Sequence, residues 1–160
     1  MTAHITRADF DDPRLEAFLA EHLRDMLATS PAESVHALDL TKLNQPSVRL
    51  WVMYEAEVLA CTGALARVHD EGPGAGDHEE LKSMRTQAAL RGRGLARRML
   101  EHLVADARDR GVQRLSLETG TEDYFAPARA MYRAAGFVPC APFGTYTLDP
   151  NSVFMTRALA

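Results

Sequence analysis

At 160 residues, with 46% hydrophobic and 25% charged positions, the chain has the size and composition of one globular domain, expected to span residues 1–160. Its net charge of −4 argues against a general nucleic-acid binder, because phosphate-binding domains are usually basic. No apolar run approaches the roughly 20 residues that span a bilayer, and the polar N-terminus does not resemble a signal peptide, so we expect a cytoplasmic protein without a membrane partner. Cys61 and Cys140 have no CxxC spacing and no histidine run nearby, so neither a disulfide framework nor a metal site is predicted.

The first half of the chain predicts a strand, a helix and a three-stranded meander. Asp12 and Pro13 supply a cap and a proline suited to a helix start, and apolar residues then recur at helical spacing as far as Ser30. A loop with a short helical turn is expected at residues 32–44, and a glycine-rich surface turn at residues 69–78. β-branched and aromatic residues favour strands at 4–8, 48–54, 58–68 and 78–86.

The second half of the chain alternates helices with strands. An apolar stripe over residues 91–110 predicts a helix closed by Gly111, and residues 127–135 predict another helix closed by Gly136. Strands are expected at 112–118, 137–140 and 152–159. This order predicts the α/β (α+β) class, with a mixed twisted sheet of about seven strands and helices on both faces.

Positive charge is concentrated in one segment of this acidic chain. A local positive field suggests a discrete anionic ligand, although a solvated basic helix face would give the same pattern. Gly92 and Gly94 favour a ligand, because a helix that opens with glycines exposes unpaired N–H groups at the positive end of its dipole, where a phosphate or pyrophosphate binds well. Between residues 81 and 100 there is no acidic residue, and the basic residues are Lys82, Arg85, Arg91, Arg93, Arg97 and Arg98.

Two common nucleotide-binding patterns fit this segment poorly. The GxxxxGK motif is absent, and the fingerprint GxGxxG places Arg97 at its third glycine. The pattern R-x-x-G-x-A does match at residues 91–96, and A-x-x-x-Y-x-x-x-G-F follows at residues 128–137. In these motifs, and in its order of elements from the first strand to the last, the chain resembles the GNAT superfamily of N-acetyltransferases, in particular a subgroup of small bacterial acetyltransferases.

The resemblance implies an acetyl-CoA-dependent N-acetyltransferase that moves an acetyl group to the amine of a small molecule, by direct transfer in a ternary complex. The strand ending at Thr86 would pair with the pantetheine arm, and a backbone N–H near Met84 would polarise the thioester carbonyl. Phe125 departs from the family pattern, because many relatives have asparagine there. The implied contacts with acetyl-CoA are Met84, Arg85, Thr86, Arg91, Gly92, Arg93, Gly94, Leu95, Ala96 and Arg97.

Acetyl transfer from a thioester to an amine needs a base for the amine and an acid for the departing thiolate. By resemblance to histone-acetylating relatives, Glu80 is expected to be the base, directly or through a water. Glu79 is the alternative base. Because neighbouring side chains of a strand point to opposite faces, only one of the two glutamates can point into the site. Tyr132 stands where relatives place the tyrosine that donates to the sulfur. Without a catalytic role, Glu80 would be a solvent-facing glutamate at the start of a strand, and Tyr132 would be a core aromatic residue.

The resemblance also implies that the acceptor amine binds opposite the cofactor, between the loop after the first helix and the final hairpin. Lys82 and Arg85 suit a substrate carboxylate, which favours an amino acid or related zwitterion over a polyamine. A protein N-terminus or lysine is an alternative acceptor, and a non-catalytic acyl-CoA-binding or sensing domain is an alternative function. A nucleic-acid partner is disfavoured by the lack of an aromatic stacking array, and a homodimer would match many relatives. The predicted acceptor contacts are Ser34, His36, Lys82 and Tyr146.

Overall fold

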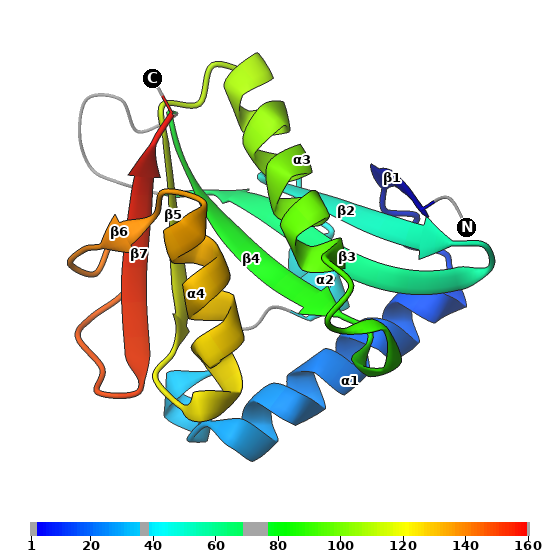
Figure 1. Ribbon diagram of the computed structural model, residues 1–160, viewed down its shortest axis with the longest axis horizontal. Coiled ribbons are helices and arrows are strands. Elements are labelled where there is room, and N and C mark those ends of the chain that lie inside the picture. The colour runs from blue at the N-terminus through cyan, green and yellow to red at the C-terminus, as the bar shows by residue number, and fades with distance from the viewer. Residues whose placement is uncertain (1–2, 36–38, 69–76, 160) are drawn as a thin grey trace.

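A mixed seven-stranded sheet forms the centre of the protein in a computed structural model, which describes residues 3–35, 39–68 and 77–159 (Figure 1). The strand order is β1-β2-β3-β4-β5-β7-β6, and among these described strands only β4 and β5 pair in parallel. The predicted fold class and number of strands are thus confirmed. The strands are β1 Ala3–Arg7, β2 Val48–Glu55, β3 Val58–Arg67, β4 His78–Thr86, β5 Arg114–Gly120, β6 Val138–Pro139 and β7 Ser152–Ala158.

Helices cover both faces of the sheet, as the sequence predicts (Figure 1). One apolar core joins α3 and α4 to one face, and a second core joins α1 and α2 to the other face, because alternate strand side chains supply the two cores. Short 3₁₀ turns cover Ala32–Ser34, Ala88–Leu90 and Asp123–Phe125. The helices are α1 Pro13–Thr29, α2 Leu40–Leu43, α3 Leu95–Asp109 and α4 Ala126–Ala134.

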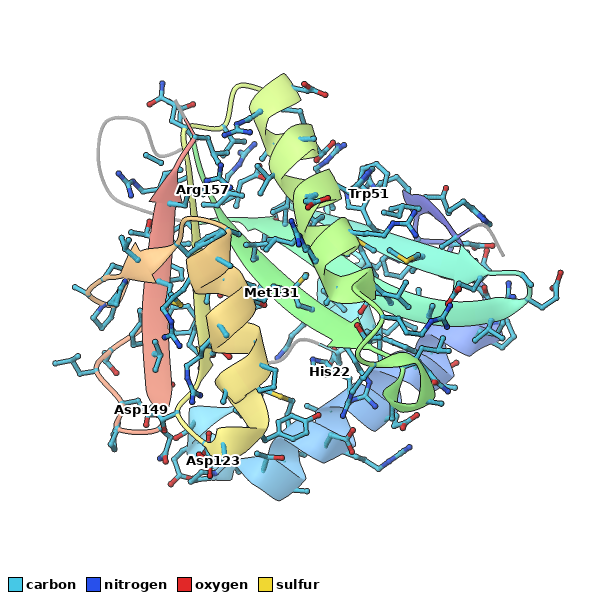
Figure 2. All side chains as sticks on the ribbon, in the orientation of Figure 1. His22, Trp51, Asp123, Met131, Asp149 and Arg157 are labelled. Atoms are coloured by element: carbon cyan, nitrogen blue, oxygen red, sulfur yellow. The ribbon has the colours of Figure 1, made fainter. Side chains whose placement is uncertain are left out.

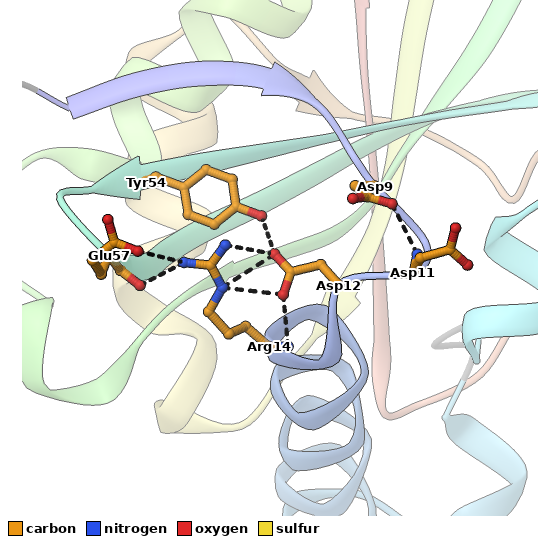
Figure 3. Close-up of polar contacts among 6 residues, drawn as sticks. All are labelled: Asp9, Asp11, Asp12, Arg14, Tyr54 and Glu57. Carbon is orange, nitrogen blue, oxygen red and sulfur yellow. Dashed lines mark hydrogen bonds and ion pairs between the residues drawn. The ribbon is translucent and has the colours of Figure 1, made fainter.

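The start of α1 is fixed by the cap that the sequence predicts (Figure 3). The Asp12 carboxylate accepts hydrogen bonds from the backbone N–H of Arg14 at 2.9 Å and from the Tyr54 hydroxyl at 2.6 Å. The Arg14 guanidinium binds the same carboxylate, and these bonds hold the pKa of Asp12 well below its usual value. Because Tyr54 belongs to β2, the cap also ties α1 to the sheet.

The helix α3 starts later than predicted. It begins at Leu95 rather than near Arg91, so the two glycines precede the helix and do not form its first turn. Gly92 and Gly94 have φ values of 81° and 78°, a left-handed conformation that no helical residue adopts. The predicted end is confirmed, because Gly111 follows the last turn with φ 83°.

The central strands β4 and β5 separate partway along their length (Figure 1). Their pairing runs only from His78 with Arg114 to Leu81 with Leu117. Beyond this point β4 contains a bulge, where two residues, Ser83 and Met84, lie opposite the single Gly63 of β3 and Ser83 has φ 53°. The far end of β4 therefore has no strand partner on the β5 side, and an opening forms in the middle of the sheet.

Candidate active site

A cleft of about 530 Å³ lies between the end of β4, the loop before α3, and α4. Figure 2 shows His22 of α1 and Met131 of α4 on the two sides of the opening at the end of β4, and both line this cleft. Nine of the ten residues predicted to contact acetyl-CoA line it as well, and Arg93 is the exception. The residues predicted to bind acetyl-CoA therefore line one largely apolar cleft.

Unpaired backbone N–H groups lie beside this cleft in residues 92–97, all of which line it except Arg93. None of the N–H groups of residues 92–97 donates a hydrogen bond to any of the described residues. The first bond of the helical ladder runs from the N–H of Arg98 to the carbonyl of Gly94, at 3.1 Å. Six consecutive free donors at the positive end of a 15-residue helix form an anion-binding site of the kind that holds phosphate groups.

The arginines around this site have different partners. The Arg91 guanidinium reaches across the cleft to the Tyr124 hydroxyl, at 3.2 Å, and lies 5.6 Å from the centre of its ring. The exposed Arg97 pairs with Glu101 along α3 at 3.2 Å. Both arginines line the cleft and carry charge that an anionic ligand can use.

Two other arginines of the basic segment turn away from the cleft. Arg93, which the sequence places among the cofactor contacts, pairs with the buried Glu55 of β2 at 2.8 Å. Arg98 donates to the carbonyl of Ala3 at 3.5 Å. A segment without acidic neighbours in sequence therefore finds partners elsewhere in the fold.

A cavity of about 100 Å³ fills the opening between β4 and β5. It shares Tyr132 with the first cleft, which contains the predicted acetyl-CoA contacts and is called the cofactor-side cleft. It shares Glu80 and Lys82 with a second cleft of about 570 Å³, which contains two of the predicted acceptor contacts and is called the acceptor-side cleft. The two clefts thus meet between a tyrosine and a glutamate, both predicted from the sequence. Such a junction can bring a bound donor and a bound acceptor into contact.

Tyr132 projects from α4 into this junction. Its side chain is buried, with 6% of the residue exposed, and packs edge-on against Phe137 at a ring distance of 5.9 Å. Its hydroxyl makes no hydrogen bond with the part of the chain that the structure describes. Burial raises the pKa of Tyr132 well above its usual value, so the hydroxyl keeps its proton and is available as a donor.

The two adjacent glutamates of β4 point to opposite faces, as strand geometry requires. Glu79 is buried on the α3 side, where Arg110 binds both of its carboxylate oxygens at 2.7 and 2.8 Å. Glu80 points to the junction, where Glu80 Oε2 accepts from the Tyr146 hydroxyl at 2.5 Å and from Lys82 Nζ at 3.2 Å. Of the two glutamates, only Glu80 faces the site.

A further carboxylate at the junction, Glu118 of β5, was not predicted from the sequence. It lines the same cavity as Glu80 and accepts from the Ser152 hydroxyl at 3.1 Å. Burial raises the pKa of Glu118 from 4.5 to about 7, and the negative charge of Glu80 adds to the rise. Strand alternation could have indicated it, because Leu117 enters the α3 core and the next residue must face the opposite side.

We expect Glu118→Gln to stabilise the protein at alkaline pH. The folded state holds the Glu118 proton up to about pH 7 and the unfolded state only up to about 4.5, so wild-type stability falls as the pH rises through this window. After a discount for partial exposure, the variant should gain about 2 kcal/mol in the free energy of unfolding at pH 8 and nothing at pH 4. Urea titrations at the two pH values measure this, and an equal difference at both would contradict the shifted pKa.

The predicted acceptor residues are only partly brought together. Lys82 and Tyr146 line the acceptor-side cleft, whereas Ser34 is buried beside it and its hydroxyl accepts from the Asn151 amide at 3.4 Å. His36 lies outside the described residues. Arg85, also considered for a substrate carboxylate, instead pairs with acidic residues of α1, Asp25 at 2.7 Å and Glu21 at 3.2 Å.

Apolar and neutral groups complete the junction. Phe125, at the position where many relatives have asparagine, is buried and lines both the cavity and the cofactor-side cleft. His22 and Met26 of α1 line the same two spaces and carried no sequence signal. Burial lowers the pKa of His22 to about 4, so its imidazole is neutral near pH 7.

Neither a metal site nor a membrane-spanning helix is found among the described residues. No group of three or more His, Cys, Asp or Glu side chains within residues 3–35, 39–68 and 77–159 is placed to hold a metal ion. None of the helices in these ranges has the length and apolar character needed to cross a membrane.

The family of the chain follows from comparisons with known proteins. The sequence profile of the Acetyltransferase (GNAT) family matches residues 13–137. An uncharacterised N-acetyltransferase of Bacillus subtilis, YsnE, is 43% identical over 156 residues, which cover 98% of this chain and 99% of that protein. The IAA acetyltransferase of Azospirillum brasilense is 40% identical over 129 residues, which cover 81% of this chain and 80% of that protein.

Solved structures share the fold. A Klebsiella pneumoniae protein assigned as an acyl-CoA N-acyltransferase is 26% identical, with a TM-score of 0.80 over 99% of both chains. Salmonella typhimurium yncA, solved with its cofactor acetyl-CoA, is 18% identical, with a TM-score of 0.75 over 100% of this chain and 95% of that one. The fold and its relatives define the protein as an acyltransferase. The chain belongs to the GNAT family of acetyltransferases.

Proposed function

We propose that the protein transfers an acetyl group from acetyl-CoA to the primary amine of a small molecule, an amino acid or a related zwitterion. The observation that carries the proposal is the junction of two clefts, with Tyr132 on the cofactor side and Glu80 on the acceptor side. Glu118 adds a second carboxylate at the same place.

The cofactor-side cleft suits a long ligand with phosphate groups at one end. The free N–H groups of residues 92–97 would hold the pyrophosphate, with Arg91 and Arg97 beside it. The unpartnered end of β4 around Met84 would pair with the pantetheine arm as an added strand does. Acetyl-CoA, when bound, supplies the acetyl group as a thioester; a relative of the same fold has been solved with this cofactor.

The residues at the junction can supply the two proton transfers that amide formation needs. A carboxylate, Glu80 or Glu118, would take a proton from the substrate ammonium, so that the nitrogen can attack the thioester carbonyl as the C–N bond forms and the C–S bond breaks. Tyr132 would give its proton to the departing sulfur, and the second proton that the nitrogen loses on becoming an amide would restore the tyrosine hydroxyl. The proton held by the carboxylate would then pass to solvent. The products are the N-acetylated amine and free coenzyme A.

Amine-dependent release of a thiol from acetyl-CoA tests this proposal. A panel of amino acids, simple amines and a polyamine is supplied with saturating acetyl-CoA, and the released thiol is followed by a colorimetric reagent. Turnover with at least one small amine is the expected result. Tight binding of acetyl-CoA without turnover on any amine would instead favour the non-catalytic acyl-CoA-binding function.

We expect Gly94→Val to weaken acetyl-CoA binding roughly 10- to 100-fold, because a side chain there obstructs backbone donors whose bonds to a charged group are each worth about 1.5–3 kcal/mol. Gly111→Val is the matched control. Both glycines have positive φ and open space where a Cβ would lie, but Gly111 is at the opposite end of α3. Calorimetric titration with acetyl-CoA should show a weakened Kd for the first variant only, and equal losses in both would contradict the assignment.

A further inference from the structure

We infer that the acceptor is a free α-amino acid with an apolar or aromatic side chain, whose carboxylate binds Lys82 and whose ammonium binds Glu80. The inference rests on the proposed function and adds to it the class of substrate and the residue that selects it. It is drawn from the hydrogen-bonding capacity, the charge and the walls of the acceptor-side cleft.

The polar end of this cleft offers one free acceptor beside one free donor. Lys82 and Glu80 are paired at 3.2 Å, and their side chains are only 11% and 13% exposed. Both bonds to the carboxylate, from Lys82 and from Tyr146, end on Glu80 Oε2, so Glu80 Oε1 has no partner among the described residues. Lys82 uses two of its three ammonium hydrogens, on Glu80 and on the Tyr146 hydroxyl at 3.0 Å.

An α-amino acid presents the complementary pair of groups. Its ammonium and carboxylate are attached to one carbon, and can therefore face the adjacent Glu80 Oε1 and Lys82 Nζ together. In that pose the amine lies at the oxygen that would take its proton, on the wall shared with the cavity that holds Tyr132. A single ion pair would both orient and activate the substrate.

The charge of the cleft favours an anionic group on the acceptor. Among the described residues its lining contains three cations, Lys42, Arg67 and Lys82, against one carboxylate, Glu80, although the whole chain carries −4. A polyamine would meet repulsion from these three cations. A protein N-terminus or a lysine side chain would bring no free α-carboxylate to Lys82.

Part of the remaining wall of the cleft is apolar. Phe143 and Tyr146 form one wall, with ring centres 5.2 Å apart in an edge-on arrangement. Val35, Val48 and Val68 contribute apolar surface to the lining. A hydrocarbon or aromatic side chain therefore finds complementary surface on this wall.

Paired substrates test the role of the carboxylate in the wild-type protein. L-phenylalanine is compared with L-phenylalaninamide, which keeps the amine and the ring but lacks the negative charge, and with L-aspartate, which changes the side chain. We expect kcat/KM for L-phenylalanine to exceed that for the amide by at least about 30-fold, since a lost bond to a buried charge is costly. A rate with L-aspartate above that with L-phenylalanine would show that Lys42 and Arg67, rather than the aromatic wall, meet the side chain, and would overturn the apolar part of the inference.

The substitution Lys82→Met then tests whether Lys82 is the residue that selects substrates with a carboxylate. The preference for L-phenylalanine over its amide should fall to within about threefold of unity. Any change in the basicity of Glu80, or in the amount of folded protein, affects both substrates and cancels in this ratio of ratios. Melting temperature reports whether the variant is folded.

Failure of the inference and failure of the proposed function give different results. Wild-type turnover that is equal on the acid and the amide, or that is found only on a polyamine or a peptide N-terminus, would overturn the inference and keep the acetyltransferase. An unchanged preference in Lys82→Met would likewise overturn it. Absence of turnover on every amine in the panel would overturn both the inference and the proposed acetyltransferase function.

Discussion

Tyr132→Phe is expected to lower kcat by roughly 10²- to 10⁴-fold while the Kd for acetyl-CoA changes less than about twofold. The ring of Tyr132 stays in the wall of the cleft, and the only group lost is a hydroxyl that has no hydrogen-bond partner among the described residues. Burial keeps this hydroxyl protonated, so it is a donor suited to a departing thiolate. Because no internal bond is broken, the melting temperature should not fall. Steady-state kinetics and calorimetric titration measure the two quantities.

Tyr124→Phe provides the control for Tyr132→Phe. Tyr124 also lines the cofactor-side cleft, but its hydroxyl is engaged by Arg91 at 3.2 Å, near the mouth of the site. Its loss should alter the affinity for acetyl-CoA and leave kcat within about threefold of the wild type. Equal losses of kcat in the two variants, or a Tyr132→Phe enzyme that keeps half of its turnover, would contradict the role of Tyr132 as the acid.

Glu80→Gln is expected to lower kcat/KM for the acceptor by at least about 100-fold. The amide has nearly the shape of the carboxylate, but it cannot take a proton from the substrate ammonium. It also removes the charge that faces Lys82, so binding of a zwitterion weakens as well. The rate is measured by thiol release across pH 5 to 9, with the amount of folded protein checked by circular dichroism.

Glu79→Gln and Glu118→Gln separate the possible bases. Glu79 lies on the other face of β4, bound by Arg110, so its substitution should lower stability and leave the rate per folded molecule unchanged. Burial raises the pKa of Glu118 to about 7, so if Glu118 is the base, kcat/KM rises with pH up to about 7 and this rise disappears in Glu118→Gln. A Glu80→Gln enzyme with wild-type kcat/KM would assign the base to Glu118.

The order of elements and the anion-binding site could be predicted from local patterns. Periodicity and caps predicted α1 from Asp12 to Ser30, and alternation with turn residues predicted the strands on both sides of it. The glycines before α3 indicated the free N–H groups, because the start of a helix is determined by a few neighbouring residues in the sequence. The start of α3 was placed too early, since its apolar stripe does not show that Gly92 and Gly94 are left-handed.

The partners of the charged residues depend on contacts that are distant in sequence. Arg93 finds Glu55 and Arg85 finds Asp25, each across dozens of residues, and no local pattern reports such pairs. Glu118 joins the site only because β4 and β5 pair in parallel and then separate beyond Leu81. Register and bulges are properties of the assembled sheet, so the acceptor side of the site emerges only from the fold.

Binding of acetyl-CoA to the cofactor-side cleft is the claim on which the proposed chemistry depends, and a melting-temperature measurement tests it most directly. Acetyl-CoA is added at about a hundredfold excess over its Kd, with ATP and NADH as controls that carry phosphates but no pantetheine arm. The expected result is a stabilisation of about 2.7 kcal/mol, or roughly 5 to 10 °C, for acetyl-CoA alone. No shift at saturating acetyl-CoA, or equal shifts with all three ligands, would contradict the assignment of this cleft to the acetyl donor.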